Sequence, residues 1–109
     1  MIFVKINGKE YAAEINGNLK DYNWNERAVK EITTDKLTHA EASELFVDDC
    51  QWSIIQRYID KETGSEVVDE YDNADYSVAG DIIDHRDGSI TIKMGKPTDL
   101  ELAYEELYG

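Results

Sequence analysis

The sequence predicts one α+β domain, made mostly of antiparallel sheet, with about seven strands and two short helices. Three observations lead to this prediction. Short runs rich in β-branched and aromatic residues are separated by turn residues, two segments begin with a helix capping box, and no linker, repeat or low-complexity tract divides the chain. The 109 residues, of which 41% are hydrophobic, suffice for one core.

The first third of the chain predicts three or four strands in a meander. Asn-Gly pairs at Asn7-Gly8 and Asn16-Gly17 indicate tight hairpin turns, because both residue types tolerate positive φ. The expected strands are Ile2–Ile6, Glu10–Ile15, Leu19–Trp24 and Arg27–Thr33, with a polar corner at Asn23–Glu26.

A short helix is expected over Thr38–Val47. Thr38 is a favourable N-cap, and Glu41 three residues later completes a capping box. Ala42, Leu45 and Phe46 form an apolar stripe, so we expect this helix to persist only by packing on a sheet.

The second half of the chain predicts two hairpins. Gln51–Ile59 is apolar on both faces, which favours a central strand, and it turns at Lys61–Ser65. Asp87-Gly88 marks the second turn. The other expected strands are Glu66–Tyr71, Tyr76–Asp84 and Ser89–Met94.

The last segment predicts a second helix after Pro97. Thr98 and Glu101 form another capping box. An apolar face follows at helical spacing, made of Leu100, Ala103, Tyr104 and Leu107. Glu105 and Glu106 lie near the C-terminus of this helix, where the helix dipole disfavours acids, and this favours a functional reason for them.

The charge of the chain restricts its partners. The net charge is −13, which opposes direct binding to nucleic acid or to anionic membranes and favours a basic protein surface. The acids are concentrated, since residues 60–87 hold ten of them against Lys61 and Arg86. The alternative is that this acidity serves only solubility.

The residues that could support catalysis are few, and we expect no enzyme and no cofactor. His39 is interpreted as a surface histidine, and His85 as part of a turn whose geometry Asp87 and Gly88 explain. Cys50 is interpreted as a small core residue. A single cysteine forms no internal disulfide, and no run of about 18 apolar residues is present, so we expect a cytosolic protein.

The acidic run Asp69–Asp75 does not fit a calcium-binding loop of the EF-hand type. In the register that starts at Asp69, Tyr71 stands where an oxygen ligand is needed, and from Asp72 that position is Ala74. No metal is expected, although an irregular divalent-cation site in this loop stays open.

A partner-binding face is predicted around the same run. Alternate carboxylates on one strand face repeat every ~6.6 Å, about two phosphate steps of ~3.4 Å along a DNA strand. Tyrosines would add desolvated anchors, although half-buried strand tyrosines are the alternative. The predicted binding residues are Glu66, Asp69, Glu70, Tyr71, Asp72, Asp75 and Tyr76.

Several stretches resemble small proteins encoded by phages and prophages. The resemblance is carried by Met1–Glu10, by Leu45–Asp49 before Trp52–Ile55, and by Ala79–Gly88 leading to Lys93–Lys96. None of these stretches is a chemical signature.

The resemblance implies two functions. One is an inhibitor similar to anti-CRISPR proteins, which blocks a Cas nuclease through a DNA-mimicking surface in the bacterial cytoplasm. The other is a tail or virion assembly component that forms homo-oligomers.

Overall fold

The computed structural model describes residues 1–108 and confirms the α+β class. Within these residues the chain forms eight strands and two helices, one strand more than predicted. The elements are β1 (Ile2–Ile6), β2 (Lys9–Ala12), β3 (Glu14–Asp21), β4 (Arg27–Thr34), α1 (His39–Leu45), β5 (Trp52–Ile59), β6 (Glu66–Asp72), β7 (Val78–Asp84), β8 (Ile90–Gly95) and α2 (Asp99–Tyr108).

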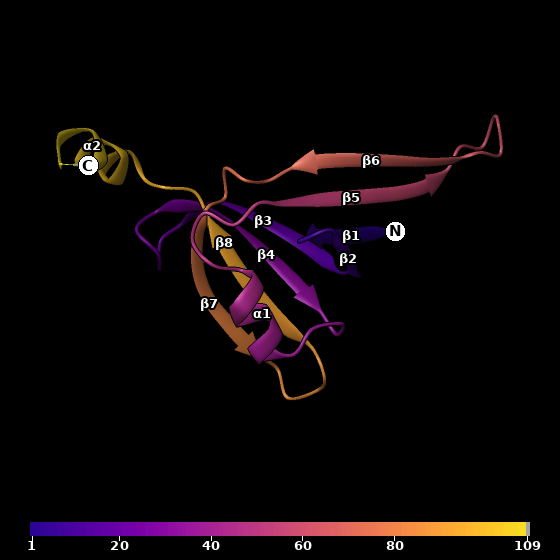
Figure 1. Ribbon diagram of the computed structural model, residues 1–109, viewed down its shortest axis with the longest axis horizontal. Helices are drawn as coiled ribbons and strands as arrows, with labels where there is room; N and C mark the ends of the chain where they lie inside the picture. Colours follow the sequence, from indigo (N-terminus) through magenta and orange to yellow (C-terminus); the bar gives the residue numbers. More distant parts are fainter. Residues whose placement is uncertain (109) are drawn as a thin grey trace.

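The strands form two four-stranded antiparallel sheets (Figure 1). The first sheet has the order β2-β1-β5-β6, and the second has the order β3-β4-β8-β7. Four hairpins supply the strands, and the β1–β5 and β4–β8 pairings join them. Strand β5 is therefore central in its sheet, as its two apolar faces predicted.

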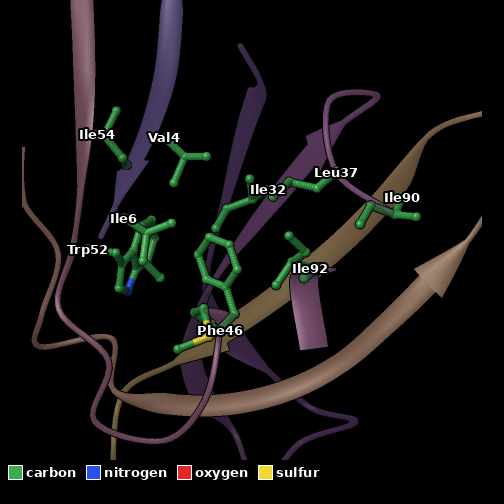
Figure 2. Packing of buried hydrophobic residues seen from close by; sticks show 11 residues of the cluster. Val4, Ile6, Ile32, Leu37, Phe46, Trp52, Ile54, Ile90 and Ile92 are labelled. Atoms are coloured by element: carbon green, nitrogen blue, oxygen red, sulfur yellow. The ribbon is translucent and has the colours of Figure 1, made fainter. Parts of the chain in front are cut away.

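The core lies between the two sheets and under α1. Figure 2 shows side chains of the two sheets directed toward one another, with Phe46 among them. Phe46 packs its ring edge against Trp52, with ring centroids 6.0 Å apart. The buried cluster comprises Val4, Ile6, Ile32, Leu37, Ala42, Phe46, Trp52, Ile54, Ile90, Ile92 and Met94.

Helix α1 begins as predicted. Thr38 Oγ1 accepts the Glu41 backbone N–H at 3.1 Å, and Glu41 Oε1 accepts the Thr38 N–H at 3.0 Å. The helix is shorter than predicted and ends at Leu45, where Phe46 leaves helical geometry and its side chain enters the core.

The predicted turn at Asn16-Gly17 is wrong. Both residues lie inside β3, where they pair with Glu31 and Lys30 of β4. The chain instead changes sheets at Ala13, and β3 turns only after Asp21, with positive φ at Asn25 and Glu26. An Asn-Gly pair tolerates a turn but does not require one, and pairing along β4 decided the outcome.

The position of the Trp24 side chain explains why glycine occupies one position in each of two neighbouring strands. A Cβ on Gly80 of β7 would lie 2.6 Å from the Trp24 ring, and a Cβ on Gly95 of β8 would lie 3.0 Å from it. The indole therefore needs the space that both glycines leave, and it fixes the β3–β4 turn against the second sheet.

Within residues 1–108, neither helix has the length and apolar character needed to cross a bilayer.

We predict that Gly80→Ala lowers the free energy of unfolding by about 1–3 kcal/mol, because the added methyl group displaces the Trp24 ring. Gly17→Ala is the control, since a Cβ at that strand glycine meets nothing within 4 Å. Urea unfolding followed by tryptophan fluorescence measures both. Equal stability of the two variants would show that the Trp24 ring does not need the space at Gly80.

Candidate functional site

The structure divides the seven predicted binding residues among three places. Side chains alternate along β6, so Asp69 cannot share a face with the other three carboxylates of this strand. The inner face of the first sheet is the one that carries Val4 and Ile54 into the core, and the outer face is the opposite one. Glu66, Glu70 and Asp72 lie on the outer face, Asp69 and Tyr71 on the inner face, and Asp75 and Tyr76 in the segment after β6.

The outer-face carboxylates have basic partners within the chain. Arg57 donates to Glu10 at 2.8 and 2.9 Å and to Glu66 at 3.3 Å. These hydrogen bonds, chiefly those that Glu10 accepts, raise the pKa of Arg57. Lys5 lies 3.5 Å from Glu70. Such exposed pairs stabilise little individually, but they lower the negative potential that the sequence predicted here.

The segment after β6 is tied to the second sheet. Asn73 is buried and accepts a hydrogen bond from Lys30. Burial lowers the pKa of Lys30, and its ammonium also lies 4.7 Å from the centre of the Tyr76 ring. Lys96 approaches the same ring at 5.0 Å and pairs with Asp75 at 3.2 Å. Tyr76 is therefore a half-buried packing residue.

The three candidate reactive residues occupy the surroundings expected of structural ones. His39 is exposed. His85 contacts Thr91 Oγ1 at 2.7 Å, and Asp87 accepts the Ser89 N–H at 2.9 Å within the turn. Burial raises the pKa of the Cys50 thiol, which lies against the core. Within residues 1–108, no group of three or more His, Cys, Asp or Glu side chains is placed to hold a metal ion.

Helix α2 is fixed by one buried cation. Arg27, only 4% exposed, donates to both Glu101 oxygens at 2.8 and 3.1 Å. The same carboxylate accepts the Thr98 N–H at 2.8 Å, which completes the predicted capping box. The hydrogen bond from Arg27 is the main reason that the pKa of Glu101 is lowered.

A cleft of about 660 Å³ opens between α2 and the body of the protein. Leu100 and Tyr104, one helical turn apart, line it from α2. Val78 and Pro97 add further apolar surface. The remaining lining residues are polar or acidic, namely Asp48, Asp49, Ser77, Glu101 and Glu105. The cleft combines an apolar lining with a carboxylate rim and is therefore a candidate binding site.

Sequence reasoning identified parts of this cleft but did not bring them together. The apolar stripe of α2 and the unfavourable Glu105 were both recognised from spacing. The opposite wall consists of Asp48 and Asp49, which directly follow the predicted helix Thr38–Val47 and were not predicted to bind a partner. Backbone hydrogen bonding places it beside β7, where Asp49 N–H donates to Ser77 O at 2.8 Å.

Comparisons of the chain with protein-family models, with curated proteins and with solved structures found no match.

We predict that acid releases α2 from the body of the protein. The lowered pKa of Glu101 means that its contribution is present above the ordinary glutamate pKa of about 4.3 and is lost as the pH falls through the lowered value. Hydrogen exchange of the α2 amides, corrected for intrinsic rates, should show protection at neutral pH that declines below that range.

Glu101→Gln removes the ion pair with Arg27 but leaves the capping box, because glutamine still supports a capping box. We expect weaker α2 protection at neutral pH and a flat pH profile in this variant. Glu106→Gln removes the same charge from an exposed position of the helix and should behave as wild type. An unchanged acid response in Glu101→Gln would show that other contacts hold the helix.

Proposed function

We propose that the protein is a structural assembly component that binds other copies of itself, of the kind found in phage tails and virions, and that it is not an enzyme. The observation that carries this proposal is the β5–β6 hairpin. Its end nearest the turn extends beyond the core, and the hairpin exposes large apolar side chains on both faces.

The hairpin loses its neighbours partway along β5. Strand β1 pairs with β5 as far as Gln56, and Met1 extends this hydrogen bonding to Arg57. Tyr58 and Ile59 pair with β6 alone. Figure 1 shows the hairpin projecting along the long axis of the molecule, with its tip at the opposite end from α2. A free two-stranded hairpin is only marginally stable in water, so a covering surface would stabilise it.

The apolar side chains of this hairpin are divided between its faces. Tyr58 and Tyr71 share the inner face and are 45% and 53% exposed. Ile59 and Val68 share the outer face and are 61% and 48% exposed. In monomeric proteins large exposed apolar side chains usually occur singly. Four on one hairpin favour an element that inserts between or against other subunits.

The inhibitor hypothesis receives less support from this geometry. A DNA mimic needs its carboxylates gathered on one rigid face, whereas those of β6 divide between two faces. Glu66, Glu70 and Asp75 also have basic partners in the chain. An inhibitor would act in the cytoplasm of the bacterial host, and an assembly component would end in the virion.

We predict that the protein exceeds its monomer mass of 12.5 kDa in size-exclusion chromatography with light scattering at tens of micromolar. The double variant Ile59→Thr with Val68→Thr keeps β-branched residues but removes apolar surface. It should weaken association at least tenfold, since each buried methylene contributes about 0.8 kcal/mol. Leu19→Thr is the control, because Leu19 is 88% exposed on β3, away from the hairpin.

A Cas-nuclease cleavage assay on the same samples separates the two functions. An assembly component leaves cleavage unchanged and tolerates replacement of Asp69, Glu70, Asp72 and Asp75 by Asn or Gln. A protein that stays monomeric, inhibits cleavage in a strongly salt-dependent way and loses inhibition in that quadruple variant would refute the assembly proposal.

A further inference from the structure

Each wall of the cleft beside α2 is held to the rest of the chain by hydrogen bonds. One wall is α2, held by the bidentate Arg27–Glu101 pair. The other is the loop before β5, where Asp48 Oδ1 accepts the Ala79 N–H at 2.8 Å. The same loop is held by the 2.8 Å backbone hydrogen bond between Asp49 and Ser77. These hydrogen bonds place both walls at the edges of the cleft before binding, which reduces the ordering that a partner must impose.

The apolar side chains that α2 contributes to the cleft are exposed. Leu100 is 81% exposed and Tyr104 is 64% exposed, although both face the cleft from consecutive turns. Leu107, a further turn along α2, is 76% exposed. These side chains form one continuous stripe, which is the surface that a second amphipathic helix covers in helix-in-groove recognition.

The rim of the cleft determines the charge of its occupant. Asp48, Asp49, Glu101 and Glu105 contribute four carboxylates, and no lysine or arginine is among the residues that line the cleft. Arg27 compensates only Glu101. An occupant must therefore bring its own positive charges, placed beside its apolar stripe.

A second copy of this chain does not meet that requirement. Its two helices, α1 and α2, contain acidic residues and neither lysine nor arginine within their bounds. These acids would face the carboxylates of the rim, and like charges brought together oppose binding. The occupant is thus a different protein, and this inference is independent of self-assembly through the hairpin.

We propose that the cleft between α2 and the Asp48–Asp49 loop docks a basic amphipathic helix of another protein. The apolar side chains of that helix lie on Leu100, Tyr104 and Val78, and its lysine or arginine side chains reach the rim carboxylates. The ten residues of α2 span ~15 Å, which matches about three turns of a partner helix.

The test uses a fluorescein-labelled helical peptide of leucine and lysine, about 14 residues long, with leucine at helical spacing. We expect saturable binding by fluorescence anisotropy, and shifts of backbone NMR signals confined to the cleft residues. A peptide with glutamate in place of lysine should not bind. A scrambled leucine–lysine peptide, which lacks the apolar stripe, should bind at least tenfold more weakly.

Two double variants distinguish binding at the cleft from general attraction of a basic peptide to an acidic protein. Asp49→Asn with Glu105→Gln removes two rim charges, and asparagine suits the positive φ of 64° at position 49. Glu44→Gln with Glu62→Gln removes two exposed charges elsewhere. We expect the affinity to fall at least tenfold in the rim variant and to change less than twofold in its matched control.

Leu100→Ser tests the apolar contact without changing charge and should also weaken binding at least tenfold. Circular dichroism must show that each variant is folded as the wild type. Equal losses in the two double variants, or full binding by Leu100→Ser, would show unspecific attraction to an acidic protein and would overturn the proposal. So would NMR shifts that lie outside the cleft.

Discussion

The buried guanidinium of Arg27 is the constraint on which the placement of α2 and of the connection before it depends. Its Nε donates to Trp24 O, and one terminal nitrogen donates to Lys96 O. Both terminal nitrogens donate to the carboxylate of Glu101. The planar group also lies over the Trp24 ring, 4.6 Å from its centre. A buried charge is tolerated only when such partners replace water. One side chain therefore joins the β3–β4 turn, the connection after β8, and α2.

This anchoring gives the molecule two extensions with different chemistry at opposite ends of its 53 Å axis (Figure 1). The β5–β6 hairpin offers apolar side chains on both faces, whereas α2 offers one apolar stripe beside carboxylates. Contacts between unlike ends generate rings or filaments, and contacts between like ends generate closed dimers. The negative charge on both extensions opposes contact between unlike ends, so copies that associate through the hairpin leave the α2 cleft free for a partner of opposite charge.

The elements that depend on neighbouring residues were predictable from the sequence, and those that depend on distant ones were not. Thr38 with Glu41, and Thr98 with Glu101, formed both expected capping boxes, because a capping box is complete within four residues. Asn16-Gly17 failed as a turn because pairing with Glu31 and Lys30 was invisible locally. The candidate site shows the same limit. Spacing identified the α2 stripe, but only the tertiary fold brings Asp49 to it.

The pairing order of the sheets has a consequence for how the chain emerges from the ribosome. Four hairpins can close locally, but the second sheet is complete only when β8 pairs with β4. The elements α1, β5, β6 and β7 lie between these two strands in the chain. Such non-local pairing is slow, because the chain loses the entropy of loop closure before the stabilising contacts between the strands form. Until Gly95 has been synthesised, β4 presents an unpaired edge, so a nascent chain stalled before that point is the form of this protein most prone to aggregate.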